Sequence, residues 1–348
     1  MFRRTFLTKT VAASFAAWTS VPNLSAQQTF LKRKKLIKPA KIRSGATVAL
    51  IAPASPPTLA KIEKALANLV ALGFKVKEGA NLRHKYGYLA GSDEERVADI
   101  HAAFTDPEVE AVWCVRGGYG CTRLLPLLDW DLIKKHPKPL IGYSDITALH
   151  IALYQKIGLV SFHGQVGGGD MTEFTLRYIS NTLMDFSKKP STIQSFYQNM
   201  RKSDEYEPFS IHPGKAEGPL IGGNLTMLAV MLGTPFAPKF KDHIVFIEEI
   251  GEAPYRIDRL LTQLIQGSDL KQAKGIVLGV FTDCIQKGDS PTLTTNECLK
   301  DRLSALGIPV YYGAPFGHIS DQCVLPYGIM ASMDADAMEF CLLEPGVY

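Results

Sequence analysis

The sequence has few of the features that mark membrane proteins, metal-bound domains or disulfide scaffolds. Beyond residue 26, no stretch approaches about 18 consecutive apolar residues, which excludes a protein with several membrane-spanning helices. The chain has 6 cysteines in 348 residues, none in a CxxC pair and none beside clustered histidines. We therefore expect no bound metal ion, and we expect most cysteines to be buried as small apolar side chains.

Acidic residues are missing from the start of the chain. Residues 1–43 contain no Asp or Glu but carry 10 Lys and Arg. Removing these from the 38 basic residues leaves 28 against 34 acidic ones, so residues 44–348 carry a net charge of about −6. A mildly acidic body argues against a nucleic-acid partner. The basic residues of 27–43 could contact an anionic lipid or polymer, but we interpret this segment as a solvated leader.

The first 26 residues have the pattern of an export signal. Arg3-Arg4-Thr5-Phe6-Leu7-Thr8-Lys9 precedes a short apolar stretch, 11–18, and Leu24-Ser25-Ala26 provides a cleavage site with a non-ideal Leu. This pattern predicts a twin-arginine signal peptide and a periplasmic protein, with an ordinary N-terminal helix as the alternative. The apolar stretch is too short to cross a bilayer comfortably, so we expect no membrane span once the signal is removed.

What remains is an ordinary globular composition, with 46% apolar and 21% charged residues. Its length suggests about two domains. In residues 44–186, short apolar runs alternate with helical patterns. We predict strands at 46–52, 74–76, 110–115 and 139–142, and helices at 58–72, 93–104, 121–128 and 145–157. This alternation predicts an N-terminal α/β domain with a Rossmann-like parallel sheet.

A polar segment rich in Lys, Pro and Gly, residues 187–215, is expected to be a linker. Beyond it, strand-like runs at 219–221, 243–248, 275–281 and 309–312 surround a helix at 254–265. We therefore predict a smaller, β-rich α+β domain over residues 216–348.

The sharpest chemical signal is Ile141-Gly142-Tyr143-Ser144-Asp145, where an apolar strand stops and a helix begins at once. A serine in such a turn can act as a nucleophile, because the turn pushes its hydroxyl clear of the sheet. The amide of Asp145 would then lie at a helix N-terminus, where it can donate to an oxyanion. The motif is not G-x-S-x-G, and Ser144 as a simple helix N-cap is the competing interpretation.

A glycine-rich run, 116–120, follows the preceding strand. In a parallel sheet this run and Ser144 would both lie at the carboxyl ends of strands, where ligands bind. Gly118 could supply a second oxyanion donor, and Arg116 could bind a carboxylate or form a structural salt bridge. We also take Tyr119 as a candidate substrate contact.

A serine nucleophile needs a base and an acid that orients it. His318 lies in a loop after the strand at 309–312, flanked by small, rigid residues, and His163 is its rival. His150 follows Ser144 too closely along the helix to face it. Glu248 closes an apolar strand and is the candidate acid, with Glu249 as the alternative.

Five sequence blocks together resemble the LD-carboxypeptidase family of serine peptidases, which includes murein tetrapeptide carboxypeptidases and microcin-immunity proteins. The blocks are Arg116-Gly-Gly-Tyr-Gly, Gly142-Tyr-Ser-Asp-Ile-Thr-Ala-Leu, Gly222-Gly-Asn-Leu, Ile247-Glu-Glu-Ile-Gly-Glu-Ala-Pro-Tyr-Arg-Ile-Asp-Arg and Gly317-His318. They occur in the family's order over about residues 44–343.

The resemblance implies a Ser144–Glu248–His318 triad, with the oxyanion held by the amides of Gly118 and Asp145. It implies an N-terminal Rossmann-like domain, a smaller β-rich C-terminal domain, a homodimer and no cofactor. The implied reaction releases terminal D-alanine from murein tetrapeptide through an acyl-enzyme. The family motif usually reads Glu-Asp where this chain has Glu248-Glu249, and we expect the first acid to belong to the triad.

An export signal departs from the cytoplasmic location of typical family members. It favours peptidoglycan stems or released muropeptides in the periplasm as the substrate. Two other functions compete with this interpretation: a microcin-immunity-like hydrolase of peptide–nucleotide conjugates, and a protein that binds muropeptides without cutting them. Export argues against the first, and the intact triad argues against the second.

Overall fold

The computed structural model describes residues 35–185, 192–194 and 206–348. The predicted signal peptide, 1–26, and the leader up to residue 34 lie outside the described residues. None of the helices in the described part is both long and apolar enough to cross a membrane.

The first sheet has six strands in the order β12-β5-β4-β3-β1-β2. They are β1 (Thr47–Ile51), β2 (Lys75–Glu78), β3 (Val109–Cys114), β4 (Leu140–Gly142), β5 (Phe162–His163) and β12 (Leu325–Pro326). All pairs are parallel except β12 with β5. The apolar run of β3 is almost wholly buried, as expected for a central strand with both faces covered.

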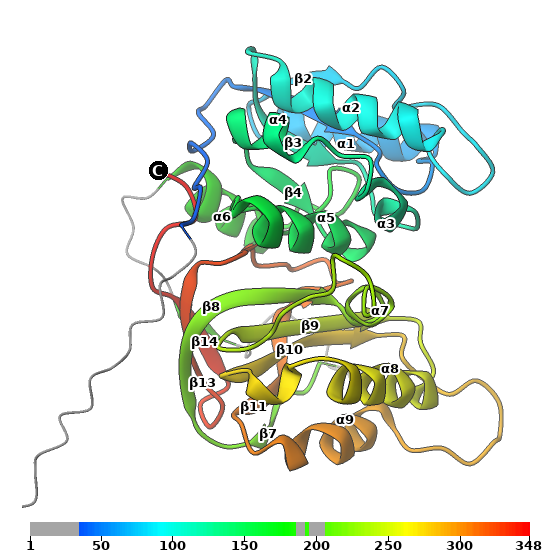
Figure 1. Cartoon of the computed structure of the whole chain (residues 1–348), viewed down its shortest axis with the longest axis vertical. Helices are drawn as coiled ribbons and strands as arrows, with labels where there is room; N and C mark the ends of the chain where they lie inside the picture. The colour runs from blue at the N-terminus through cyan, green and yellow to red at the C-terminus, as the bar shows by residue number, and fades with distance from the viewer. Residues whose placement is uncertain (1–34, 186–191, 195–205) are drawn as a thin grey trace, which may run out of the picture. The chain divides into compact units, whose positions relative to one another are not determined.

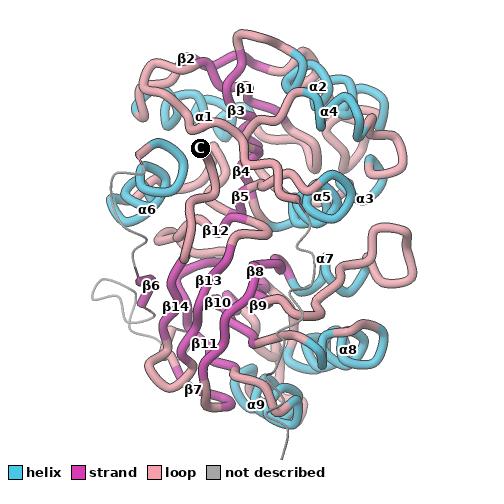
Figure 2. The backbone as a smooth tube through the Cα atoms, turned by 60° about the vertical axis from the view of Figure 1, so that its left-hand side comes forward, coloured by secondary structure: helices cyan, strands magenta, loops and turns pink. Residues whose placement is uncertain are grey.

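Helices cover both faces of this sheet, with α1 and α6 on one side and α2, α4 and α5 on the other (Figure 2). Their bounds are α1 (Leu59–Ala71), α2 (Asp93–Thr105), α3 (Cys121–Leu124), α4 (Trp130–Lys135), α5 (Thr147–Ala152) and α6 (Glu173–Ile179). Ser92 begins α2 with a capping box to Glu95. This layering confirms the predicted N-terminal α/β architecture.

The second sheet has eight strands in the order β6-β14-β13-β8-β9-β10-β11-β7. They are β6 (Thr192–Gln194), β7 (Phe209–His212), β8 (Lys215–Asn224), β9 (Ile244–Ile250), β10 (Gly275–Thr282), β11 (Val310–Gly317), β13 (Met330–Asp334) and β14 (Glu339–Leu342). Helices α7 (Leu225–Val230), α8 (Pro254–Gly267) and α9 (Thr295–Leu303) lie together along one side of it (Figure 1). The predicted β-rich C-terminal region is confirmed.

Residues 187–215, which we predicted to be a linker, contain two strands of this second sheet. β6 pairs with β14 at one end of the sheet, and β7 pairs with β11 at the other. Edge strands keep one side open to solvent, so polar residues are tolerated there and hide the strand pattern in the sequence.

The chain also returns from the second sheet to the first. β12, from the region predicted as the C-terminal domain, pairs with β5 through Leu325 and His163. The Tyr327 amide donates to the Ser161 carbonyl at 3.0 Å, and the Tyr348 amide to the Pro39 carbonyl at 3.1 Å. A division at residue 216 therefore does not separate two independent sheets.

A glycine of β8 is required by close packing. Gly222 has a φ of +157°, and a Cβ built on it would lie 1.8 Å from the carbonyl oxygen of Phe246 in β9. The Gly222 carbonyl also accepts from the Tyr327 hydroxyl at 2.8 Å. No side chain fits here unless β8 and β9 separate.

We predict that Gly222→Ala lowers the free energy of unfolding by more than about 4 kcal/mol, because its methyl group meets main chain that cannot give way. Gly233→Ala is the matched control, since Gly233 has a φ of +79° but open space around it. Its cost should be the backbone strain alone, about 1–2 kcal/mol. Urea unfolding measures both, and equal losses would contradict the packing argument.

Candidate active site

Ser144 lies in a strained turn at the carboxyl end of β4. Tyr143 is extended, and Ser144 has a φ of +66°, which is uncommon for a residue with a side chain. A 3₁₀ turn, Ser144–Ile146, then leads directly into α5. This strand–turn–helix path is the geometry of a nucleophile elbow, and strain of this kind clusters at functional sites. No side-chain cap hydrogen bond involves Ser144, so the N-cap interpretation does not describe it.

Small residues leave room for this turn. A Cβ on Gly117 would lie 2.8 Å from the Ser144 Cβ, and one on Gly142 would lie 3.1 Å from Ile146 Cγ1. The glycine-rich loop after β3 therefore packs directly against the serine. This contact explains, by close approach, why both positions lack a side chain.

His318 and Glu248 reach Ser144 from the second sheet. His318 follows β11 directly, and its Nε2 lies 3.1 Å from the Ser144 Oγ. Its Nδ1 lies 2.7 Å from Glu248 Oε2 in β9. Because a carboxylate only accepts, Nδ1 carries the donated hydrogen, and Nε2 is left to accept from the serine hydroxyl. The structure therefore brings all three predicted residues into one hydrogen-bonded chain.

The two adjacent glutamates have different partners. Glu248 faces His318, whereas Glu249 accepts from the Asn224 side chain at 2.8 Å and from the Thr226 amide and hydroxyl at 2.8 and 2.7 Å. Successive side chains of a strand point to opposite faces, so only one of the pair can reach His318. Glu249 instead accepts hydrogen bonds at the amino end of α7, where a negative charge is favourable.

The rival histidines do not reach the serine. His150 donates from Nε2 to the Gly142 carbonyl at 2.9 Å, and its Nδ1 lies 2.8 Å from the Ser161 hydroxyl. Burial lowers the pKa of His150 to about 4. His163 is fully buried among the rings of Tyr143, Phe246 and Phe316, and burial holds its pKa well below the usual value.

The electrostatics of His318 favour its protonated form. Burial lowers its pKa, but the charge of Glu248, the hydrogen bond to Glu248 and the charge of Glu249 together outweigh burial, so the pKa is raised. The Glu248 side chain is completely buried and that of His318 is 15% exposed. An imidazolium formed here would thus be stabilised by a fixed, desolvated carboxylate.

The side chain of Asp145 anchors the glycine-rich loop to the elbow. It is buried, and its Oδ2 accepts from the Cys121 amide at 2.8 Å. Desolvation raises the pKa of Asp145 despite this hydrogen bond. The sequence did not predict this anchoring role of the Asp145 carboxylate, because only the Asp145 amide was considered as a functional group.

The other predicted residues lie around the same loop. Gly118 has a φ of +127° and packs on Ser55, whose hydroxyl accepts from the Tyr119 amide at 3.0 Å. The exposed Tyr119 ring meets Tyr88 edge to face at 5.5 Å. Arg116 donates from Nε to the Gly117 carbonyl at 3.0 Å. Ser55 was missed, although its position after β1, at the same edge of the sheet, was a usable signal.

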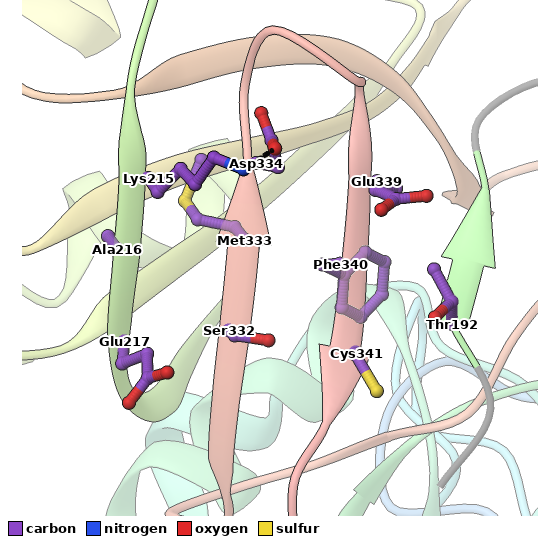
Figure 3. Close-up of a pocket in the computed structure, with 10 residues that line it drawn as sticks. All are labelled: Thr192, Lys215, Ala216, Glu217, Ser332, Met333, Asp334, Glu339, Phe340 and Cys341. Carbon is purple, nitrogen blue, oxygen red and sulfur yellow. Dashed lines mark ion pairs between the residues drawn. The ribbon is translucent and has the colours of Figure 1, made fainter.

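Over the described ranges, no three His, Cys, Asp or Glu side chains are grouped to hold a metal ion. A pocket of about 470 Å³ does lie on β6, β14, β13 and β8 (Figure 3). It contains the ion pair of Lys215 with Asp334, at 2.7 Å, and none of the three residues of the hydrogen-bonded chain lines it. It is a feature of the sheet surface separate from Ser144.

A doubly covered parallel sheet that presents a serine on an elbow, with a histidine and a buried carboxylate in line, defines a serine hydrolase. Residues 48–164 match the family described as LD-carboxypeptidase N-terminal domain, and residues 217–333 match the LD-carboxypeptidase C-terminal domain. The chain belongs to the LD-carboxypeptidase family of serine peptidases.

Named relatives agree with this assignment. The chain is 41% identical over 312 residues to the probable murein peptide carboxypeptidase of Bacillus subtilis, covering 89% of this chain and 95% of that protein. It is 36% identical to the murein tetrapeptide carboxypeptidase of Pseudomonas aeruginosa, covering 84% and 94%. Among solved structures, it resembles the microcin C7 self-immunity protein MccF in complex with aspartyl sulfamoyl adenosine, with 25% identity, a TM-score of 0.80 and coverage of 90% and 100%.

We predict that NMR titration of His318 gives a pKa above 6.5, and that Glu248→Gln brings it below 6.5 because burial then dominates. Glu249→Gln should cause a smaller fall. The ion pair of His318 with Glu248 adds to folding stability below pH 6.5. This contribution is lost as the pH rises through the raised pKa of His318. An unchanged pKa in Glu248→Gln would show that Glu248 does not control the imidazole.

Proposed function

We propose that the protein is an exported serine carboxypeptidase that releases the terminal D-alanine from murein tetrapeptide stems. The observation that carries this proposal is the hydrogen-bonded chain from Glu248 through His318 to Ser144, within an LD-carboxypeptidase fold. The names of the relatives in Bacillus subtilis and Pseudomonas aeruginosa support a murein peptide as the substrate.

Catalysis begins with proton transfer from the Ser144 hydroxyl to Nε2 of His318, across the 3.1 Å contact. The serine oxygen attacks the carbonyl carbon of the L,D-amide, and a tetrahedral oxyanion forms. His318 then gives its proton to the amide nitrogen, the C–N bond breaks, and D-alanine leaves. Water, deprotonated by the same imidazole, hydrolyses the acyl-enzyme and restores Ser144.

Glu248 orients His318 and balances the imidazolium that exists between these two proton transfers. Because the pKa of His318 is raised, the base is active only when the pH exceeds that value, so the rate should rise with pH on the acid side. The amides of Gly118 and Asp145 hold the oxyanion in this proposal. Loss of one such donor typically costs roughly 10²–10³-fold in turnover.

A second candidate is a hydrolase of peptide–nucleotide conjugates, like the microcin-immunity proteins. The structural similarity to MccF bound to aspartyl sulfamoyl adenosine favours it. The higher identity to murein peptide carboxypeptidases, 41% against 25%, favours the tetrapeptide reaction.

We predict that the purified protein removes one alanine from disaccharide tetrapeptide, as measured by mass spectrometry. Ser144→Ala should reduce this rate by roughly 10⁴-fold or more, because the nucleophile is gone. Circular dichroism of the variant controls for folding, and aspartyl sulfamoyl adenosine serves as the competing substrate. Cleavage of that compound alone would select the second candidate, and tight binding of tetrapeptide without turnover would indicate a binding protein.

The periplasmic location and the homodimer are parts of the same proposal. The twin arginines at positions 3 and 4 support export, and the family resemblance supports the dimer. We predict that the double substitution Arg3→Lys and Arg4→Lys moves the protein from the periplasmic to the cytoplasmic fraction, as measured by immunoblotting. Arg33→Lys, in the basic leader, is the matched control and should be exported. Normal export of the double variant would exclude a twin-arginine signal.

A further inference from the structure

Among the described residues, two cationic side chains near the glycine-rich loop have no ion-pair partner. Within the described part of the chain, no carboxylate comes within 4.0 Å of the charged nitrogens of Lys61 or Arg116, whereas the neighbouring Lys64 is paired with Asp170 at 2.5 Å. Both side chains are half-buried. Charges that are partly withdrawn from water and left unpaired are costly, which points to an anion that completes the site.

The backbone brings these two residues together. Lys61 lies in the first turn of α1, and Arg116 directly follows the buried residue Val115. The Gly168 amide donates to the Val115 carbonyl at 3.0 Å, and a Cβ on Gly168 would lie 2.6 Å from Lys61 Cγ. The stem of Lys61 thus packs on the loop that follows β5, beside the end of β3 that leads to Arg116.

The glycine-rich loop after β3 connects Arg116 to the catalytic chain. Gly117, next to Arg116, packs on Ser144, and the Arg116 side chain folds back onto the Gly117 carbonyl. The Asp170 carboxylate, in the loop after β5, accepts from the hydroxyl of Ser320 at 3.0 Å, and Ser320 is two residues beyond His318. Asp170 is therefore already bound by Lys64 and Ser320, and its charge does not neutralise both remaining cations.

The lowered pKa of Lys61 agrees with this arrangement. Burial lowers its pKa first, the positive charges of Arg116 and Lys64 lower it further, and Asp170 only partly opposes them. The repulsion from Arg116 shows that the two cations share one electrostatic environment. A bound anion would relieve it.

We propose that Lys61 and Arg116 together bind the terminal carboxylate of the peptide substrate, a site that rests on the carboxypeptidase function proposed above. The guanidinium presents a planar fork that matches a carboxylate, and the ammonium adds a second, mobile donor. Only the last amide of a chain has a free carboxylate one residue beyond the scissile bond. Recognition of that group restricts cleavage to the terminal D-residue.

The test compares two stem tetrapeptides that differ only at the end, one with a free D-alanine carboxylate and one with D-alaninamide. The wild type should prefer the acid at least tenfold in kcat/KM. Lys61→Met should lower kcat/KM for the acid roughly 10–100-fold, the cost of a lost charged hydrogen bond, and change the amide less than about threefold. Arg116→Gln should behave in the same way. Lys134→Met, which removes an exposed lysine from α4, is the control and should keep the wild-type preference.

An equal loss on acid and amide in Lys61→Met would assign Lys61 a structural role and overturn the proposal. Calorimetry on Ser144→Ala separates this outcome from a failure of the proposed reaction. If the wild type cleaves neither peptide, but Ser144→Ala binds the acid more tightly than the amide and loses that preference with Lys61→Met, the carboxylate site stands and the reaction does not. A Ser144→Ala protein without preference for the acid overturns the site, whatever the turnover.

Discussion

The hydrogen bond between His318 and Glu248 is the interaction on which the rest of the site depends. A fully buried carboxylate costs several kcal/mol unless it is paired, and here the pairing group is itself nearly buried. The bond fixes which imidazole nitrogen faces Ser144 and raises the pKa of His318. Glu248 lies in β9 and His318 directly follows β11, and both strands pair in parallel with β10, which lies between them. The separation of the two side chains is therefore set largely by main-chain hydrogen bonding. β9 and β11 are thus built as rigid supports for one ion pair.

The nucleophile belongs to the other sheet, and several polar contacts keep the two sheets in register around it. The Asn224 amide donates to the Thr147 hydroxyl at 3.1 Å, which joins the end of β8 to the first residue of α5. Tyr327 bonds across to the Gly222 carbonyl at 2.8 Å, and β12 pairs with β5. Thr147, in the first of these contacts, is three residues beyond Ser144. The 3.1 Å approach of serine to histidine therefore reflects the whole interface between the sheets.

Local patterns were enough to predict the elements that carry Ser144, His318 and Glu248, because each of the three residues lies in or just after a buried apolar run. Other features have no local signal. Glu248 and Glu249 lie next to each other in the same buried strand, and only the orientation of the strand distinguishes them. β12 has two residues and β6 has three, which is too short for any periodicity to show. Lys61 lies on an amphipathic helix, where an unpaired cation has the same sequence signature as a solvated one.

The placement of β12 also orders events during synthesis of the chain. Ser144 emerges from the ribosome early, but the edge of β5 stays unpaired until residues 325–326 arrive. His318 emerges only shortly before them. Translation therefore separates the two groups in time: while the 174 residues from Ser144 to His318 are being added, the nascent chain carries the nucleophile without its base.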